Sequence, residues 1–367
     1  MKKVILLLFA ALCFSSFTTK SFLVKGSVDN EALNGKTLFI KERVNGAWGL
    51  VDSAVVVNGR FAFKGVADTA KIVYLDYEYP KTNNVHQAFV LESGEITAEV
   101  DTAGFMVITG TPQNDLLQTY QYIKKAFNKK AEAFYNAHKD NVITPEQKLL
   151  FAAEEDNLNR QEAAIDKKFA TDHINTLIGT YVFTNSFYNW TTKDKEAVIA
   201  LFNVETRNVK RVKEIIADVE IEKKVSVGNK YVDLKLPGLD GNLIALSDLV
   251  GKTDYVLVDF WASWCGPCMR FLPELKAFYT KHQGSKFTIL GVSLDKTKGP
   301  WVAAVTSHQM AWKQVSDLKG WKSEGSRAYA VNSIPCTVLI DRQGRIVGRN
   351  LSLPEIEKLL IEKAVIK

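Results

Sequence analysis

The alternation of apolar and polar residues in the first part of the chain is typical of short β-strands. Turn signals separate these segments, at Asn34-Gly35, Asn45-Gly46, Asn58-Gly59 and Ser93-Gly94. In Val55–Phe63, an Asn-Gly pair lies between β-branched and aromatic residues. Such residues favour pleated strands, and Asn-Gly adopts the positive φ angles that a two-residue turn requires. We therefore predict a hairpin there and an all-β, sandwich-like domain over residues 21–112.

Near residue 113 the pattern changes to the three- and four-residue spacing of a helix face. The first such face holds Leu116, Tyr120, Ile123, Phe127, Ala131 and Phe134. Thr144-Pro145-Glu146-Gln147 then has the form of a helix start, with Thr as N-cap, Pro at the first helical position and Gln completing a capping box. Later apolar positions at helical spacing are Leu158, Ile165, Phe169, Ile174, Leu177, Ile178, Tyr181, Val198, Leu201, Phe202, Val209, Val212 and Ile216. Because the charges are mixed and form no motif, we interpret residues 113–224 as a helical linker region, with a partner-binding role as the alternative.

From residue 225 onward, apolar strands alternate with amphipathic helices. Tyr255–Trp261 is a continuous apolar strand with one acid, Asp259, inside it, and Phe287–Leu294 is a second buried strand. The other elements expected are helices at Met269–His282, Thr297–His308 and Pro354–Lys363, and a hairpin from Cys336–Ile340 to Arg345–Arg349 across Gln343-Gly344. Strands that alternate with helices predict an α/β domain over residues 225–367.

The composition is that of an ordinary globular protein. The chain has 367 residues, of which 46% are hydrophobic and 24% charged. This length suggests about two to three domains. The net charge of +6 is not gathered in a basic stripe, which argues against nucleic-acid binding. Four cysteines in a chain of this length exclude a disulfide scaffold.

Residues 1–20 have the pattern of a secretory signal peptide. Lys2 and Lys3 precede an apolar run that is shorter than the ~20 residues needed to span a bilayer, and small and polar residues follow it. Cys13 follows Leu12, where a lipid-attachment site has a small residue, so lipid anchoring is not expected. We therefore expect export to a periplasm, with an uncleaved anchoring helix as the alternative.

The segment with recognisable chemistry is Trp264-Cys265-Gly266-Pro267-Cys268, which lies between a predicted strand and a predicted helix. Two cysteines at this spacing at a helix N-terminus can come within disulfide distance. Unpaired backbone N–H groups and the helix dipole favour a thiolate at Cys265, the expected nucleophile and the more exposed thiol. Cys268, one turn later, is placed to resolve a mixed disulfide.

Two other interpretations of this pair are half of a zinc site and an inert structural disulfide. A zinc site needs further ligands at short spacing. After the predicted leader, Cys336 is the one other cysteine in the sequence, and His138 and His173 are isolated. We therefore expect no metal site.

The WCGPC segment resembles the thioredoxin family, and the resemblance covers residues 225–367. Together with the leader, a preceding hairpin at Leu239–Leu243 and a strand and helix inserted after the active-site helix, it is similar to the periplasmic TlpA/ResA-like thiol-disulfide oxidoreductases. The β-rich part resembles a domain often found ahead of such modules, for which the resemblance implies no activity. The sequence thus predicts an α/β thioredoxin fold at the C-terminus, preceded by an all-β sandwich-like domain and a helical linker region.

This resemblance also implies roles for individual residues. Ile334-Pro335 matches the family's cis-proline loop, which faces the two cysteines and offers its backbone to an extended substrate. The remaining substrate-facing residues would be Trp264, Gly266 and Pro267. Asp259 matches the buried acid of thioredoxin. A carboxyl group inside an apolar strand should have a raised pKa, and it could accept the proton of Cys268 through water.

Two residues depart from the TlpA/ResA-like pattern. Phe271 stands where many members have Glu, which weakens any transfer of the subgroup's specificity for cytochrome maturation. Cys336 follows Pro335, where the family has Thr or another small residue. We interpret Cys336 as a small core residue that stays reduced, with a redox role as the alternative.

The sequence therefore predicts an exported thiol-disulfide oxidoreductase that needs neither cofactor nor metal. Its partners would be protein disulfides and a membrane or periplasmic thiol electron donor. A thiol peroxidase is one alternative, because it shares the fold, but its reactive cysteine lies in a Pro-x-x-x-Thr-x-x-Cys context that WCGPC does not match. A ligand- or partner-binding protein with a tethered redox module is the non-enzymatic alternative.

Overall fold

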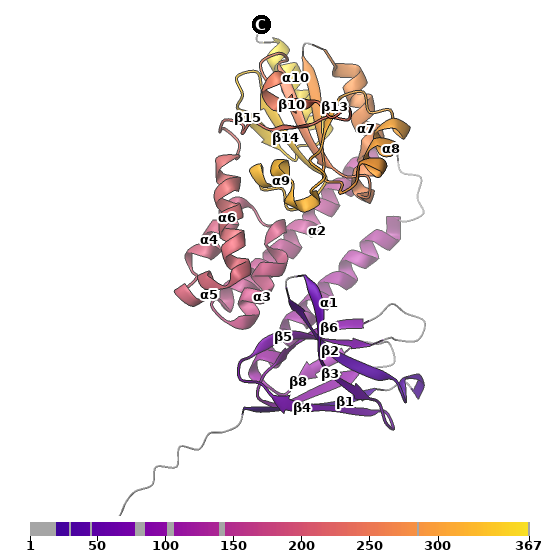
Figure 1. The fold of residues 1–367 in the computed structure, drawn as a ribbon, viewed down its shortest axis with the longest axis vertical. Helices are drawn as coiled ribbons and strands as arrows, with labels where there is room; N and C mark the ends of the chain where they lie inside the picture. Colours follow the sequence, from indigo (N-terminus) through magenta and orange to yellow (C-terminus); the bar gives the residue numbers. More distant parts are fainter. Residues whose placement is uncertain are drawn as a thin grey trace, which may run out of the picture. The chain divides into compact units, whose positions relative to one another are not determined.

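The computed structural model describes residues 20–28, 31–44, 46–77, 85–100, 106–138, 144–284 and 286–365. The predicted signal peptide lies outside the described residues except for Lys20, and so does Cys13. The chain divides into two compact units, one formed by Met1–Leu158 and Thr176–Tyr181 and the other by Asn159–Asn175 and Val182–Lys367. Figure 1 shows the elements of both.

The N-terminal strands form two four-stranded sheets. The first sheet has the order β4 (Arg60–Val66), β1 (Ser21–Val28), β7 (Gly94–Val100), β8 (Met106–Thr109). The second has the order β3 (Ala47–Val55), β2 (Thr37–Val44), β5 (Lys71–Tyr77), β6 (Val85–Leu91), and a 3₁₀ helix, η1 (Glu31–Leu33), precedes β2. Alternate residues of both sheets share one apolar core, among them Val24, Phe63, Leu38 and Val73. The predicted all-β sandwich is confirmed.

The turn at Asn58-Gly59 forms as predicted, but the hairpin expected around it is wrong. Both residues have positive φ angles, 50° and 71°, and Val57 and Arg60 exchange a pair of backbone hydrogen bonds across the turn. Beyond that bridge the strands separate, because β3 pairs with β2 and β4 pairs with β1. Phe61 is thereby buried in the core on the opposite sheet from β3, so burial overrides the local pairing preference.

Between the sandwich and the C-terminal domain, the described residues form six α-helices. They are α1 (Pro112–His138), α2 (Pro145–Asp172), α3 (Leu177–Ser186), α4 (Thr192–Ala200), α5 (Val204–Asn208) and α6 (Lys210–Lys224), with the 3₁₀ helix η2 (Phe187–Asn189) before α4. The predicted capping box at the start of α2 is confirmed. The backbone N–H of Gln147 donates to Oγ1 of Thr144 at 3.3 Å, and the backbone N–H of Thr144 donates to Oε1 of Gln147 at 2.8 Å.

The buried face of α1 differs from the predicted one. Ile123 is exposed, whereas the polar residues Asn114 and Gln118 are buried. The side chain of Asn114 bonds to the backbone N–H and the carbonyl of Val90, both at 2.8 Å. Oε1 of Gln118 accepts from the N–H of Ile108 at 2.9 Å. These amides satisfy backbone groups of β6 and β8, which an apolar face could not do.

The C-terminal domain is built on a five-stranded sheet. Its order is β13 (Lys313–Val315), β12 (Phe287–Ser293), β11 (Tyr255–Trp261), β14 (Cys336–Asp341), β15 (Ile346–Arg349). The pairs from β11 to β13 are parallel, and those from β11 to β15 are antiparallel. The helices are α7 (Gly266–His282), α8 (Lys298–Ser307), α9 (Glu324–Ala328) and α10 (Leu353–Val365), and a short hairpin, β9 (Lys235–Pro237) and β10 (Leu243–Ala245), precedes the sheet. Two 3₁₀ helices, η3 (Leu246–Asp248) and η4 (Gly320–Lys322), complete it.

The central strand, β11, shows why a continuous apolar sequence predicts a strand in this domain. Every residue of β11 is buried, as a strand with neighbours on both edges and helices on its faces requires. The strand predicted at Tyr255–Trp261 is confirmed. The helix predicted at Met269–His282 starts earlier, at Gly266. The pattern does not predict β13 or α9, because three and five residues are too few to show a period.

Candidate active site

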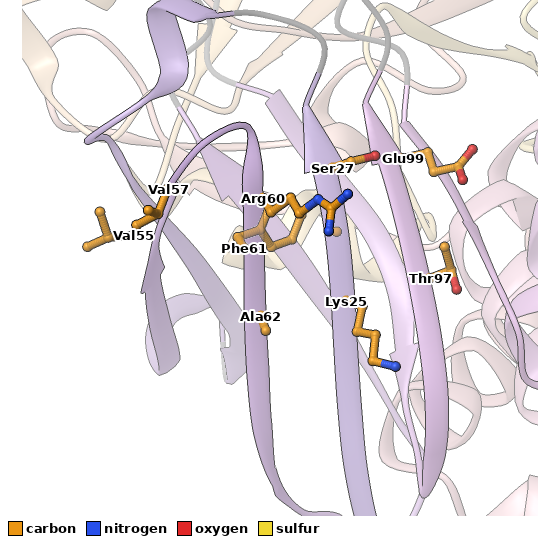
Figure 2. A pocket seen from close by; sticks show the side chains of 10 residues that line it. Lys25, Ser27, Val55, Val57, Arg60, Phe61, Ala62, Thr97 and Glu99 are labelled. Carbon is orange, nitrogen blue, oxygen red and sulfur yellow. The ribbon is translucent and has the colours of Figure 1, made fainter.

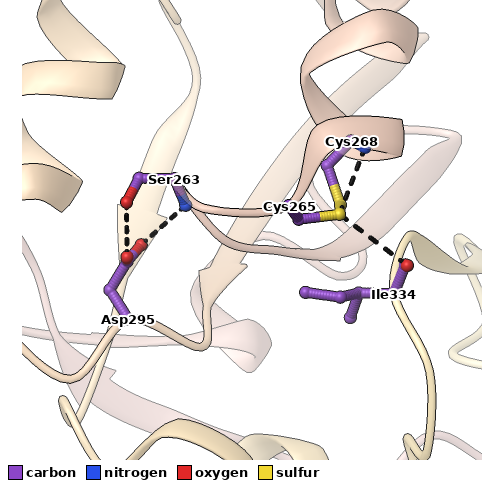
Figure 3. Close-up of a disulfide and its surroundings, with 5 residues drawn as sticks. All are labelled: Ser263, Cys265, Cys268, Asp295 and Ile334. Carbon is purple, nitrogen blue, oxygen red and sulfur yellow. Dashed lines mark hydrogen bonds between the residues drawn. A yellow bond between two sulfur atoms is a disulfide. The ribbon is translucent and has the colours of Figure 1, made fainter. Parts of the chain in front are cut away.

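The two cysteines of the motif lie where β11 passes into α7. Cys265 is the N-cap of α7, and the backbone N–H of Cys268 donates to its Sγ at 3.2 Å. The Sγ atoms of Cys265 and Cys268 are joined in a disulfide, with 5.2 Å between the two Cα atoms (Figure 3). Pro267 stands in the first turn of the helix, where its missing N–H has no helical partner to lose.

The expected difference in exposure between the two cysteines is wrong for this disulfide form. Cys265 and Cys268 are each 4% exposed. Their surroundings differ instead, because Trp264, Gly266 and Pro267 beside Cys265 are exposed, whereas Cys268 packs within α7. The loop before β14 contacts Cys265.

That loop contains the proline singled out in the sequence. The peptide bond between Ile334 and Pro335 is cis. The carbonyl oxygen of Ile334 lies 3.7 Å from Sγ of Cys265 (Figure 3). Pro335 itself is exposed on one side and contributes to a small cavity behind the dithiol on the other. The loop therefore offers a backbone acceptor directly beside the reactive sulfur.

Asp259 lies in the middle of β11 and is 3% exposed. Burial raises the pKa of its carboxyl group from 3.8 to about 7, because the charged form loses its hydration. A cavity of about 10 Å³ is lined by Asp259, Cys268, Phe271 and Pro335, among others. Such a volume holds roughly one water molecule. The carboxyl group and the inner cysteine thus face one shared small space.

Trp264, which precedes Cys265, lies next to a second exposed tryptophan. Trp264 is 56% exposed and Trp321, in η4, is 44% exposed, with their ring centroids 6.2 Å apart. Arg270 lies near the motif, since a Cβ on Gly266 would make an ordinary contact with its Nη1 at 3.5 Å. By contrast, Trp261 is buried, and its Nε1–H donates to Oε1 of Gln314 at 3.0 Å. The sequence analysis identified Trp264 and missed Trp321 and Arg270.

Comparison with known proteins supports the resemblance to the thioredoxin family. Residues 252–346 match the family described as Thioredoxin-like. Thiol-disulfide oxidoreductase ResA of Geobacillus kaustophilus is 30% identical over 139 residues, which is 37% of this chain and 77% of that protein. ResA of Bacillus cereus is 28% identical over 138 residues, 38% of this chain and 77% of that protein. The chain belongs to the ResA-like thiol-disulfide oxidoreductases of the thioredoxin superfamily.

Solved structures of thiol-disulfide oxidoreductases are similar to a little over a third of the chain. A thiol-disulfide oxidoreductase from Bacteroides fragilis is 28% identical and covers 36% of this chain and 99% of its own, with a TM-score of 0.34. The thioredoxin domain of a thiol-disulfide oxidoreductase from Bacteroides vulgatus is 30% identical and covers 37% and 98%, with a TM-score of 0.34. Residues 22–117 match a domain of unknown function, DUF4369.

In this ResA-like domain, a carboxylate that the sequence analysis missed holds the segment leading to the dithiol. Asp295 follows β12, and its Oδ2 and Oδ1 accept from the backbone N–H of Ser263 at 3.0 Å and from its hydroxyl at 2.6 Å (Figure 3). The hydroxyl of Ser293 donates to the same carboxylate at 2.8 Å. An acid directly after a buried strand was the available signal, since strand ends meet at the site in this fold class.

Cys336 is a free cysteine at the start of β14 and is buried. Burial raises the pKa of its thiol, and the nearby Arg349 guanidinium opposes that rise only in part. The thiol is therefore held in its protonated, weakly nucleophilic form. This environment agrees with the interpretation of Cys336 as a small core residue.

The rest of the described chain was searched for metal sites, membrane-spanning helices and surface hollows. No group of three or more His, Cys, Asp or Glu side chains is arranged to hold a metal ion in the described part of the chain. Among the described helices, none is both long and apolar enough to cross a membrane. A hollow of about 610 Å³ lies on the outer face of the first sheet, where Lys25, Arg60 and Glu99 bring mixed charges (Figure 2).

Proposed function

We propose that this protein exchanges disulfides with exported proteins through Cys265 and Cys268. The observation that carries the proposal is the disulfide at the N-terminus of α7, next to the carbonyl oxygen of Ile334. A dithiol at a helix N-terminus gains a stabilised thiolate, because a backbone N–H and the helix dipole face the sulfur. The reaction class, thiol-disulfide exchange, is inferred from the family, and the individual steps are inferred from the residues of this chain.

In the reducing direction, the Sγ thiolate of Cys265 attacks one sulfur of a substrate disulfide. A mixed disulfide forms, and the other substrate sulfur leaves as a thiolate and takes a proton. The sulfur of Cys268 then attacks Sγ of Cys265, which restores the Cys265–Cys268 disulfide and releases the second substrate thiol. Two electrons and two protons pass to the substrate. A membrane or periplasmic thiol donor then supplies two electrons and two protons to the Cys265–Cys268 disulfide and so restores the dithiol.

Asp259 would take the proton of Cys268 during the second step. Its raised pKa, about 7, supports this assignment, because a base with a pKa near the working pH is efficient. The small shared cavity supports transfer through one water molecule. Once the dithiol is oxidised, the proton can leave Asp259 to solvent.

The substrate would dock as an extended segment beside the dithiol. The Ile334 carbonyl and the exposed surface of Gly266, Pro267 and Pro335 would face its backbone. Trp264 and Trp321 offer an aromatic surface to an apolar side chain next to the substrate cysteine. The leader pattern of residues 1–20 supports export to the periplasm as the place where such substrates occur.

The test is insulin reduction with dithiothreitol, run beside peroxide consumption. Insulin precipitation that depends on the protein supports disulfide exchange, and peroxide consumption without it supports the peroxidase alternative. Activity in neither assay favours the binding protein with a tethered redox module. Equilibration of the dithiol with glutathione buffers gives its redox potential, which decides between a reductant and an oxidant.

A further inference from the structure

Three segments meet near the dithiol, and together they carry more positive than negative charge. The hydroxyl of Ser263 donates to Asp295 at 2.6 Å, which places residues 295–298 beside the motif (Figure 3). The ring centroids of Trp264 and Trp321 lie 6.2 Å apart, which places residues 317–324 next to residues 264–270. These segments contain the carboxylates of Asp295, Asp317 and Glu324. Their five cations, which we call the basic rim, are Arg270, Lys296, Lys298, Lys319 and Lys322.

The charge that these segments expose to solvent is mostly positive. All five cations of the basic rim are exposed. Asp295 is 2% exposed, and its carboxylate accepts the bonds from Ser263. The side chain of Asp317 is 8% exposed, and its oxygens accept from the backbone N–H groups of Lys319 and Glu324. Of the three acids, Glu324 alone is exposed.

Two cations of the basic rim lie against the motif and the tryptophan pair. A Cβ on Gly266 would lie 3.5 Å from Nη1 of Arg270, so this guanidinium lies beside the first residue of α7. A Cβ on Gly320 would lie 3.0 Å from Cε of Lys296, so the Lys296 side chain packs over the residue before Trp321. Neither cation forms an ion pair with another described residue. Their charges are therefore available to a partner.

We propose that the basic rim docks substrate segments in which acidic side chains flank the reacting cysteine. Exposed tryptophans inside a ring of cations fit a partner that brings an apolar residue with carboxylates around it. A basic segment would be repelled at the same place, so the rim also selects against such substrates. The inference rests on the proposed function, because it names the class of substrate for the same site.

The basic rim could affect the reaction in a second way. Cations near Cys265 would stabilise its thiolate, which would speed the attack on every substrate alike. Docking of an acidic segment instead speeds the reaction of acidic substrates relative to neutral ones. The ratio of the two rates therefore measures docking and is not changed by the thiolate effect.

The experiment measures attack by the reduced full-length protein on three peptides of equal length. Each peptide carries one cysteine as its 2-thiopyridyl disulfide, flanked by glutamates, by glutamines or by lysines. The Cys265 thiolate attacks the peptide sulfur, and 2-thiopyridone leaves and is followed by its absorbance. Cys265→Ser gives the background from other thiols. Each rate is divided by the rate of the same peptide with dithiothreitol, which removes differences in intrinsic reactivity.

We expect the glutamate peptide to react about tenfold faster than the glutamine peptide at low salt, and the lysine peptide to react more slowly than both. The preference should disappear between 0.01 M and 1 M salt, because the Debye length falls from about 30 Å to about 3 Å. Equal rates for the three peptides at low salt, or a preference that survives 1 M salt, would overturn the proposal.

Two double variants with the same loss of charge locate the effect. Arg270→Gln with Lys296→Gln should reduce the preference for glutamate over glutamine by about threefold or more. Lys252→Gln with Lys286→Gln is the matched control and should keep the preference. Both control lysines are exposed, and the carbonyl of Lys286 accepts from the N–H of Tyr255, at the end of β11 away from the dithiol. An equal loss of preference in both double variants would overturn the proposal, because net charge alone would then explain it.

Insulin reduction separates this proposal from the proposed function. Insulin reduction without a preference for the acidic peptide overturns the docking proposal and leaves the proposed function standing. A preference for the acidic peptide without insulin reduction supports the docking surface and contradicts the proposed function. No reaction of Cys265 with any of the three peptides contradicts both.

Discussion

Asp259 and Cys268 line the same cavity of about 10 Å³, which places the buried carboxyl group and the inner cysteine around room for about one water molecule. The dithiol is oxidised here, so Cys268 carries no proton. The same geometry in the reduced enzyme would put the carboxylate within reach of the Cys268 proton through that water. A base in this place matters most during resolution of the mixed disulfide, when Cys268 must lose its proton.

The Asp259→Asn variant should resolve mixed disulfides more slowly than the wild type near neutral pH. General-base help is typically worth ~10²-fold, and relay through water lowers that figure. The wild-type rate should rise with pH around 7, as Asp259 loses its proton and becomes a base, and this rise should be missing in the variant. The measurement is single-turnover disulfide exchange followed from pH 5 to pH 9.

Asp341→Asn provides a matched control for that experiment. Asp341 is also buried, and it lies at the other end of the sheet, opposite Tyr255 on β11. Its variant should keep the wild-type pH profile. Overlapping profiles for the wild type and Asp259→Asn would remove Asp259 from the mechanism.

Cys265→Ser and Cys268→Ser should fail in different ways. Cys265→Ser loses the nucleophile and should abolish insulin reduction. Cys268→Ser should accumulate mixed disulfides on Cys265, because the resolving thiol is missing. Non-reducing electrophoresis with mass mapping of the trapped partner checks this. If both variants trap partners equally well, the roles are assigned wrongly.

Removal of either exposed tryptophan should weaken substrate docking without affecting the chemistry. Trp264→Ala and Trp321→Ala should each raise KM for a protein disulfide substrate about fivefold, since an aromatic contact is worth about 1 kcal/mol, while kcat changes less than twofold. Trp48→Ala, an exposed tryptophan of the β-domain, is the control and should leave KM unchanged. A fall in kcat alone would place these rings in the chemistry instead of in docking.

Cys336 should remain a thiol when the dithiol is oxidised. Alkylation of the air-oxidised chain beginning at Ser21, under denaturing conditions, should label one cysteine, and peptide mapping should locate the label on Cys336. Cys336→Thr should keep insulin reduction within about twofold, because a buried cysteine behaves mostly as a small hydrophobe. Label on Cys265 or Cys268, with Cys336 protected, would indicate a mechanism with three thiols.

Features encoded by neighbouring residues could be predicted from the sequence. The fully buried strand Tyr255–Trp261 is predicted by its nearly continuous apolar sequence. The dithiol is predicted by the spacing of Cys265 and Cys268. The division of the chain at residues 20, 112 and 224 stays a prediction. The N-cap at Thr144 was also visible, because a cap depends on the next three residues.

Features that depend on contacts between distant segments could not be predicted in this way. Val55–Phe63 has the local pattern of a hairpin, yet its two halves pair in different sheets. The bond between Ser263 and Asp295 and the proximity of Trp264 and Trp321 each join residues more than thirty positions apart. The contact between Cys265 and the loop at Ile334 likewise joins distant segments. The position of Asp295 after a buried strand marks it as a candidate, but a single sequence does not show which distant residue it will contact.

Asp259 should also make the stability of the C-terminal domain fall as the pH rises. Its folded-state pKa, about 7, is above the ordinary value of 3.8, so the folded state keeps a proton that the unfolded chain has already lost. Below pH 3.8 both states carry the proton and Asp259 has no effect. Between pH 3.8 and 7 the folded state loses stability, and above 7 the full penalty of about 4 kcal/mol applies.

Asp259→Asn should therefore flatten this dependence. Between pH 5 and pH 8, the free energy of unfolding of the variant should fall by about 2–3 kcal/mol less than that of the wild type, measured by urea unfolding at each pH. The buried amide adds a donor that changes stability by the same amount at every pH, so the slope is the quantity to compare. Asp341→Asn, treated in the same way, controls for the loss of a buried acid elsewhere in the sheet. Parallel curves for the wild type and Asp259→Asn would mean that Asp259 is already ionised at pH 5, and the proton relay would then lose its physical basis.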